Sequence, residues 1–222
     1  MRKIPFLTML LAAIAALAPA LADQKPYPFK SAIIKYRIGG SIQQGTQMLY
    51  IDDHGKKTRT ERETTINVMG MKRKDSSLEI DDGNYHYRID LIRKTGEKLP
   101  SYSKRAEEMV KAMSAEQKKG MEALGKELAK GLTGTEDMKP TGKGVILGKE
   151  CKMYDLMGVK SWLWNNLALK IENPGLGNMV QEAVEIAVDV PIDANKFKPP
   201  PGIAITETPR RATTPQPRNP SK

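Results

Sequence analysis

The sequence predicts an α+β fold in which runs of antiparallel strands flank a helical segment. Two observations favour this class. Before residue 90 and after residue 148, apolar and polar residues mostly alternate in short runs that end at turn-forming residues, as expected for strands with one buried face. Between these two regions, apolar residues recur at steps of three and four, which is the period of an amphipathic helix.

The first half of the chain predicts five strands joined by tight turns. The alternation that begins at Lys30 ends at Gly39 and Gly40, and two later Asp-Asp pairs are each followed by glycine within two residues. Such clusters between β-prone runs are typical of hairpin turns. Between these breaks we expect strands over residues 30–38, 46–51, 57–68, 77–80 and 85–89.

The middle of the chain, residues 103–131, predicts an amphipathic helical insertion. Ser114 and Gln117 have the spacing of a capping box, and Gly120 and Gly125 weaken the centre, so one long helix and two shorter ones both stay open. Lysine and glutamate fill the polar face. The apolar positions are Ala106, Met109, Val110, Met113, Met121, Leu124, Leu128 and Leu132.

Strands resume after a loop rich in glycine, lysine and threonine. We expect them over residues 149–156, 159–164 and 167–172, with turns at residues 157–158 and 165–166. A last strand is expected over residues 184–190, where four β-branched residues argue against a helix. Trp162 and Trp164 are two residues apart in a strand and should share one sheet face. The sequence leaves open whether that face meets core, cargo or solvent.

The N-terminus has the pattern of a secretory signal peptide. Arg2 and Lys3 precede an apolar run, and Ala20-Leu21-Ala22 forms an A-x-A exit before Asp23. An uncleaved anchor would need about 20 apolar residues, and Pro19 breaks this run. We therefore expect residues 1–22 to be removed after Ala22, which in a bacterium predicts a periplasmic protein with no remaining transmembrane segment.

The mature chain divides into a domain over residues 23–207 and a tail over residues 208–222. The tail holds four prolines, four basic residues and no acidic residue, so we expect it to be disordered and solvated, with binding to an anionic surface as the alternative. The net charge of +10 falls to +8 without the signal. Outside the cytoplasm, this charge favours an anionic membrane surface or acidic partners over nucleic acid.

No motif predicts catalysis, a metal or a cofactor. Cys151 is the only cysteine, so no intrachain disulfide forms, and neither His54 nor His86 lies in a protease motif that would activate it. We interpret Cys151 as a small apolar residue on a sheet. Two histidines and one cysteine, widely spaced, do not make a zinc site. No G-x-S-x-G elbow or P-loop is present.

The candidate ligand-binding residues are apolar. Met109, Met113 and Met121 lie on one face of the predicted helix, where they fill a core or line a pocket for variable apolar ligands. Together with Trp162 and Trp164 they form the predicted cavity. At about 0.8 kcal/mol for each buried CH₂, a twelve-carbon acyl chain would contribute roughly 10 kcal/mol before the costs of association.

Several short stretches give the chain a family resemblance. They are Asp82-Gly83 with Tyr85 and Tyr87, Asp90 with Thr95-Gly96, Gly148 to Cys151 with Tyr154, Trp164 with Leu167 to Lys170, Glu182-Ala183, and Ile192-Asp193 followed by Phe197, Pro200 and Gly202. In this order, after a signal peptide, they resemble the superfamily of LolA, LolB and LppX. More closely, they are similar to an uncharacterised branch labelled outer-membrane lipoprotein-sorting protein.

The resemblance implies a curved antiparallel sheet, a half-barrel, whose concave face is covered by the helical insertion. It also implies a periplasmic protein that holds lipid-like or acylated cargo between sheet and helices. In the LolA carriers an arginine inside the barrel controls opening. No local motif assigns that role to one of the four strand arginines here, which are Arg37, Arg59, Arg62 and Arg88.

The leading functional hypothesis is therefore a non-enzymatic periplasmic binding or carrier protein for lipid-like cargo or an acylated lipoprotein. The alternative is a periplasmic module that binds a partner or senses envelope stress without a bound lipid. An enzyme ranks third, because no catalytic motif is present.

Overall fold

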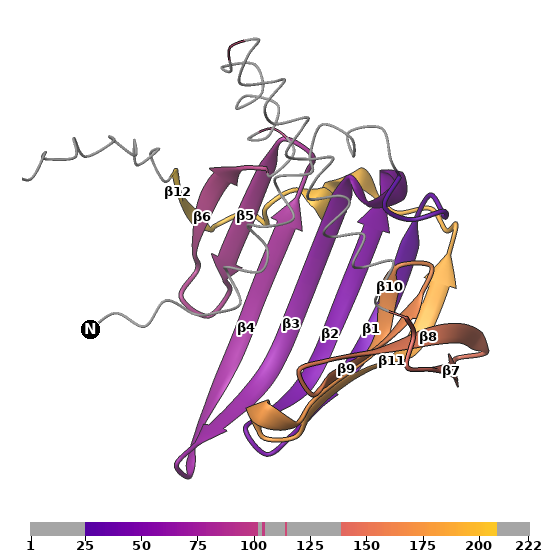
Figure 1. The fold of residues 1–222 in the computed structure, drawn as a ribbon. Helices are drawn as coiled ribbons and strands as arrows, with labels where there is room; N and C mark the ends of the chain where they lie inside the picture. Colours follow the sequence, from indigo (N-terminus) through magenta and orange to yellow (C-terminus); the bar gives the residue numbers. More distant parts are fainter. Residues whose placement is uncertain (1–24, 102–103, 105–113, 115–138, 208–222) are drawn as a thin grey trace, which may run out of the picture.

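The computed structural model describes residues 25–101, 104, 114 and 139–207, and these form one open sheet of twelve strands (Figure 1). Neighbouring strands are antiparallel, except that β12 runs parallel to β6. The order across the sheet is β12-β6-β5-β4-β3-β2-β1-β11-β10-β9-β8-β7. The strands are β1 (Ala32–Gly39), β2 (Gln43–Asp52), β3 (Lys57–Val68), β4 (Met71–Asp81), β5 (Tyr85–Asp90), β6 (Thr95–Pro100), β7 (Gly142–Ile146), β8 (Lys149–Leu156), β9 (Val159–Trp164), β10 (Leu167–Asn173), β11 (Met179–Val188) and β12 (Ala204–Glu207).

Most strands predicted from alternation are confirmed. The predicted bounds of residues 57–68, 149–156 and 159–164 are those of β3, β8 and β9. The last predicted segment is a strand, β11, and not a helix. The turns between β8, β9 and β10 are also where the sequence places them, and their residues Met157, Gly158, Asn165 and Asn166 all have positive φ, which suits tight hairpins.

The strands that the sequence did not predict lie where no sheet face is continuously buried. The first part of β4 reads Met-Lys-Arg-Lys and is exposed throughout, so it has no apolar alternation. Strand β6 has one buried residue, Gly96, and β12 has none. Hydrophobic periodicity cannot reveal such strands, because both of their faces meet water or small residues.

The predicted α+β class is wrong for the described part of the chain. Strands make up 63% of these residues and helical turns 7%, and no helix among them reaches seven residues. The short turns are η2 (Asp53–Gly55), η4 (Pro174–Leu176) and η5 (Ala194–Phe197), all 3₁₀. Both core clusters of the described residues are built from strands and loops, so their apolar faces are buried without a packed helix. The helical insertion predicted over residues 103–131 lies outside the described residues, apart from Lys104 and Ser114.

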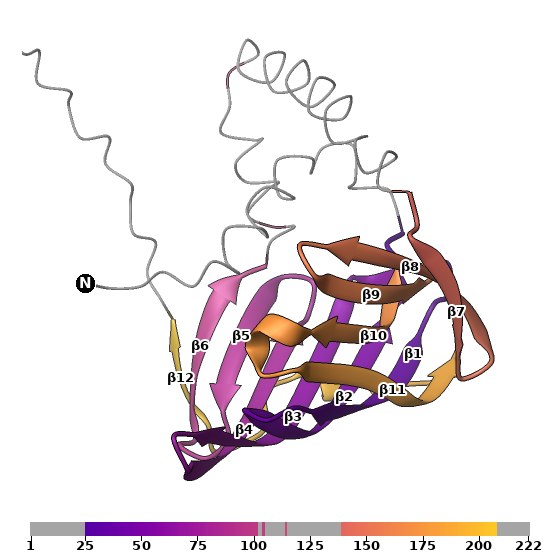
Figure 2. The same cartoon turned by 60° about the horizontal axis from the view of Figure 1, so that its bottom comes forward.

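The part of the sheet that runs β2-β1-β11-β10-β9-β8-β7 curls strongly and encloses a core on its concave face (Figure 2). Ile34 and Tyr36 of β1 pack in one cluster with Leu169 of β10, Cys151 of β8 and Ile146 of β7. Side chains from strands that far apart can meet only on the inside of the bend. The concave core therefore results from the sheet folding toward itself. None of the helices among the described residues is long and apolar enough to cross a membrane.

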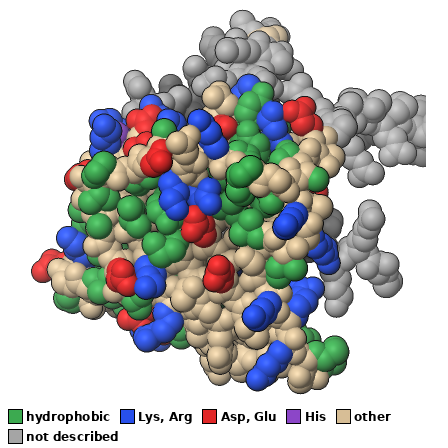
Figure 3. Space-filling view, turned by 180° about the vertical axis from the view of Figure 1, so that it is seen from behind, with side chains coloured by type: hydrophobic (Ala, Val, Ile, Leu, Met, Phe, Trp, Pro, Cys, Tyr) green, Lys and Arg blue, Asp and Glu red, His purple; other side chains and the backbone are tan. Residues whose placement is uncertain are grey.

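A second core lies on the convex face, under residues 189–203, which we call the C-terminal strap. Phe197 of η5 is 4% exposed and packs with Leu78, Ile80 and Ile89 of β4 and β5. Ile192 and Ile203 of the strap pack around this cluster. Elsewhere, hydrophobic and charged side chains are interspersed on this face (Figure 3). The strap thus covers the apolar residues on the convex face of β4 and β5, which would otherwise be exposed to solvent.

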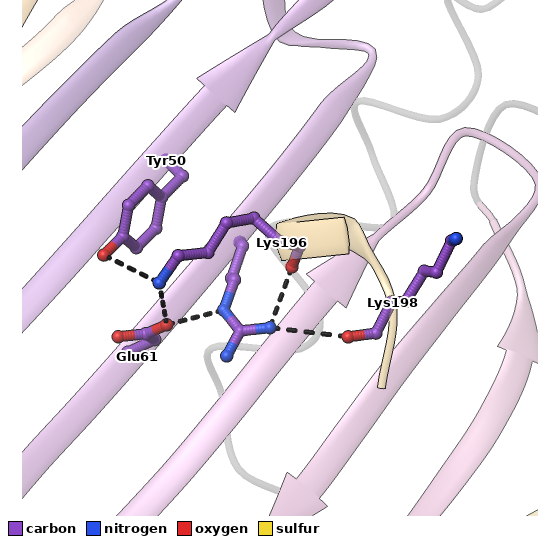
Figure 4. A network of polar contacts seen from close by, with 5 residues as sticks. Tyr50, Glu61, Lys196 and Lys198 are labelled. Atoms are coloured by element: carbon purple, nitrogen blue, oxygen red, sulfur yellow. Dashed lines mark hydrogen bonds and ion pairs between the residues drawn. The ribbon is translucent and has the colours of Figure 1, made fainter. Parts of the chain in front are cut away.

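Polar contacts fix the strap to β3 (Figure 4). The Nη1 atom of Arg59 donates to the carbonyl oxygen of Lys196 at 2.8 Å, and its Nε atom donates to Glu61 at 2.6 Å. Lys196 Nζ lies 3.5 Å from the same Glu61 oxygen and 3.3 Å from the Tyr50 hydroxyl. Because the Arg59 side chain is only 14% exposed, these charged bonds are shielded from water and hold η5 in register with the sheet.

Candidate functional site

The concave face of the sheet consists of two walls with different chemistry. Directly paired residues on adjacent strands point to the same face, so the register assigns each side chain. Alternate residues of β7 to β11, β1 and β2 form an apolar wall around the concave core. Their counterparts on β3 to β6 are mostly polar or charged, and they include Arg62, Ser77, Glu79, Arg88 and Glu97.

A stack of three aromatic rings packs against the apolar wall near the start of β10. Phe29 lies between Tyr27 and Trp164, with centroid distances of 5.1 and 5.6 Å and interplanar angles of 11° and 7°. Phe29 is buried. Lys149 Nζ is 4.9 Å from the centre of the Trp164 ring, which suits a cation–π contact. Trp164 therefore serves the core at this end of the wall.

Trp162 lies on the same face, further along β9. Both tryptophans pack against the concave core, which confirms that they share a face. A bulge in β10 between Ala168 and Lys170 brings Lys170 opposite Trp162, with Nζ 5.0 Å from the ring centre. Trp162 is only partly buried. Trp164 is also partly buried, but only Trp162 lies outside the aromatic stack, so Trp162 is the better candidate for contact with a ligand.

Gly144 on β7 has no side chain, and the indole ring of Trp162 packs in the space where one would lie. A Cβ atom at this glycine would lie 2.9 Å from Cδ1 and 3.0 Å from Nε1 of the ring. We therefore expect Gly144→Ala to displace the indole and lower the free energy of unfolding by about 1–3 kcal/mol, the usual range for overpacking.

Urea unfolding followed by tryptophan emission measures this effect. Gly39→Ala is the matched control, because Gly39 also lies in a strand, has no atom within 4 Å of its Cβ position and has no positive φ. Its free energy of unfolding should change by less than about 0.5 kcal/mol. Equal effects of the two substitutions would contradict the packing of Trp162 on Gly144.

Arg62 stands at the boundary between the two walls. Its Nε and Nη2 atoms both donate to Oε1 of Gln47, at 3.0 and 2.6 Å, and Gln47 is buried. Among the described residues, Nη1 has no hydrogen-bond partner. Gln47 thus orients a partly buried guanidinium that keeps donors for an anionic group beside an apolar surface.

The polar wall carries an open hollow of about 490 Å³ over β4, β5 and β6. Ile203 and Ile205 pack on the other face of these strands and do not line it, so it lies on the concave side. This volume is in the range of small-ligand sites. The concave side chains that line it are Asp75, Ser77, Glu79, Arg88, Asp90, Thr95, Glu97 and, from β12, Thr206.

The register separates the four strand arginines into two pairs. Arg59 belongs to the strap contacts, and Arg37 is exposed on the convex face, where it pairs in register with Thr46. Arg62 and Arg88 lie on the concave face. Only Arg62 adjoins the apolar wall, through Gln47.

Cys151 belongs to the concave core and is 2% exposed, which confirms its interpretation as a buried apolar residue. Burial raises the pKa of its thiol, and Sγ donates to the carbonyl oxygen of Lys149 at 3.4 Å. A nucleophilic cysteine needs a lowered pKa. Burial also lowers the pKa of His86. Within the described ranges, no group of three or more His, Cys, Asp or Glu side chains could hold a metal ion.

Of the five predicted cavity residues, Trp162 and Trp164 lie on the apolar wall, whereas Met109, Met113 and Met121 lie outside the described residues. Sequence reasoning did not single out Gln47 or relate Arg62 to the apolar wall. Residues 57–68 are rich in threonine and charge on both faces, so no local signal distinguishes Arg62 from Arg59. The pairing of β3 with β2 supplies that distinction.

No family model matches the chain, and no curated protein matches it. Among solved structures, an uncharacterized conserved protein from Thermus thermophilus has 8% identity and a TM-score of 0.48, over 89% of this chain and 99% of that chain. Structures of PNGF-II in the C2 and P21 space groups have 13% and 14% identity and TM-scores of 0.41 and 0.39. They match 81% of this chain but only 31% and 32% of PNGF-II. Similarity at this level assigns neither a family nor a function, and none of the three is named as LolA-like.

Proposed function

We propose that this protein is a non-enzymatic periplasmic carrier that holds an amphiphilic cargo, a lipid or the acyl group of a lipoprotein, on its concave face. The proposal includes removal of residues 1–22 during export and membership in the superfamily of LolA, LolB and LppX. One observation carries it, which is the position of Arg62 between an apolar wall and a polar wall.

The apolar wall, with Arg62 at its edge, fits a ligand with an apolar chain and an anionic head. Trp162 and Leu49 are partly buried members of the apolar wall, so they retain surface for an acyl chain. Arg62 can face a carboxylate or phosphate. Binding of such a cargo requires no catalytic group. Each CH₂ group that is buried contributes about 0.8 kcal/mol to the affinity.

Saturable binding of a fluorescent fatty acid tests the proposal. Protein from the periplasmic fraction is delipidated, refolded and titrated in vesicle-free buffer, with Trp162 as energy-transfer donor. We expect one site per chain and competition by unlabelled acylated peptides. Trp162→Phe should remove most of the energy transfer, whereas Trp164→Phe controls for the tryptophan that is stacked in the core.

The proposal fails if uptake does not saturate, or if acylated and non-acylated peptides compete equally well. A stoichiometric protein partner recovered with the empty protein would instead support the module that binds a partner without a lipid.

A further inference from the structure

The large hydrophobic side chains that are exposed concentrate at one end of the sheet. Because the antiparallel strands alternate in direction, the connections β1–β2, β3–β4, β5–β6, β8–β9 and β10–β11 all lie at this end. Of the ten exposed large hydrophobic residues described, eight lie on these connections or the strand ends beside them. We call this set the apolar rim: Ile42, Val68, Met69, Met71, Ile92, Leu156, Met157 and Leu176.

Backbone contacts tie three of these connections together. Asn67 N donates to the Ile42 carbonyl at 2.7 Å, which joins the β3–β4 hairpin to the β1–β2 loop. Ser41 N donates to the Gly177 carbonyl at 2.9 Å, which joins that loop to the connection containing η4. The β1–β2, β3–β4 and β10–β11 connections of the rim are therefore joined, whereas the β5–β6 and β8–β9 turns are separate tips at the same end of the sheet.

Two turns of the rim place methionine where the backbone disfavours it. Met69 and Met157 have φ of 52° and 53° and are followed by Gly70 and Gly158, also at positive φ. Asparagine, aspartate and glycine suit this position best. Both methionines are 95% exposed, so the core gains nothing from them. Both side chains are therefore available for contact with a surface outside the molecule.

Positive charge lies directly behind the longest of these tips. The β3–β4 hairpin projects past both neighbouring strands. Its ladder continues to the pair Val68–Met71, whereas β2 pairs with β3 only as far as Ile66 and β5 pairs with β4 only as far as Ser77. Lys72, Arg73 and Lys74 follow, all exposed, and residues 66–74 contain no acidic residue. Figure 3 shows hydrophobic side chains at this projecting tip, lower right, with basic side chains behind them.

We propose that the apolar rim docks on the surface of an anionic phospholipid bilayer. Met69 and Met157 enter the interface, and Lys72, Arg73 and Lys74 contact the lipid headgroups. Separate tips suit a fluid interface better than a continuous protein groove, since each flexible methionine can enter independently. Apolar insertion combined with attraction to anionic lipid is the usual basis of interfacial binding. Membrane docking by the rim goes beyond the proposed cargo binding and does not depend on it.

Flotation with vesicles of phosphatidylcholine, with and without about one third phosphatidylglycerol, tests the proposal on residues 23–222. The wild-type protein should float with the anionic vesicles, and less so at high salt. Met69→Asp with Met157→Asp should weaken this binding at least about tenfold. The control is Val145→Asp with Leu147→Asp, which adds the same charge at the opposite end of the sheet, and Leu147 has a matching φ of 50°. It should bind as the wild type does.

A second measurement does not depend on the aspartate variants. In a Cys151→Ser background, an environment-sensitive fluorophore on Met69→Cys should shift to the blue with anionic vesicles, and the same label on Leu147→Cys should not. The proposal is overturned if the wild type does not float, if rim and control variants lose binding equally, or if neither label shifts. The proposal is also overturned if the wild-type protein is a dimer and the rim variants become monomeric without any loss of vesicle binding. Fatty-acid titration without vesicles reports on the cargo proposal separately.

Discussion

Phe197→Ala is expected to lower the free energy of unfolding by about 3–5 kcal/mol. Phe197 belongs to the strap, is 4% exposed and packs on Leu78, Ile80 and Ile89. Its loss leaves a cavity under a strap that has no other fully buried large side chain. The 3₁₀ turn is too short to fill that space by local collapse. The effect should therefore lie at the upper end for core truncations.

Urea unfolding, followed by circular dichroism and by tryptophan emission, measures this loss. The two tryptophans report on the concave core, so coincident transitions would show that both faces unfold as one unit. Ile92→Ala is the control, because Ile92 is 57% exposed and should change the free energy of unfolding by less than about 0.5 kcal/mol. A cost below about 1 kcal/mol for Phe197→Ala would mean that the strap is separable from the sheet.

Arg62→Met is expected to weaken binding of a fatty-acid anion by about 10- to 100-fold. Hydrogen bonds to charged groups contribute about 1.5–3 kcal/mol, and each factor of ten in affinity corresponds to about 1.4 kcal/mol. Methionine keeps much of the apolar stem of arginine and removes the guanidinium. A fatty alcohol of equal chain length should bind the variant and the wild type alike, because it carries no charge for Arg62.

Arg37→Met is the matched control for this second prediction. Arg37 is an exposed strand arginine on the convex face, so its loss changes net charge equally and should leave both ligands unaffected. Arg62→Met also costs stability, about 1–3 kcal/mol, because buried Gln47 loses its donors. Titrations are therefore made well below the melting temperature of the variant. Equal weakening of acid and alcohol would show that Arg62 supports the site only by packing.

The strands that could be predicted are those with one buried face. In β1, Ala32, Ile34, Tyr36 and Ile38 are buried, while the residues between them are partly or fully exposed. Strands β8 and β9 were bounded by the turns at residues 157–158 and 165–166, and β3 was indicated by its threonine-rich run and not by a buried apolar face. The strap gave no such signal, since Phe197 is isolated among prolines and lysines and its partners lie more than a hundred residues away.

For the candidate site, the sequence predicted only that certain residues share one face of the sheet. The spacing of Trp162 and Trp164 fixed their common direction, and the lone cysteine without a catalytic partner pointed to a buried thiol. The position of Arg62 at the edge of an apolar wall depends on the order β3-β2-β1-β11-β10 across the sheet. The fold class failed because a helical period in one segment was extended to the whole architecture.

The sequence by itself determined most of the strands, their turns and which residues share a face, because alternation and turn chemistry act over a few neighbouring residues. Tertiary structure alone decided which face is concave, what covers the convex face and which arginine adjoins the apolar wall. These depend on strand order and on curvature, which bring residues from distant segments into contact. The same is true of the apolar rim, whose tips are scattered from Ile42 to Leu176 and meet only because antiparallel strands return to one end.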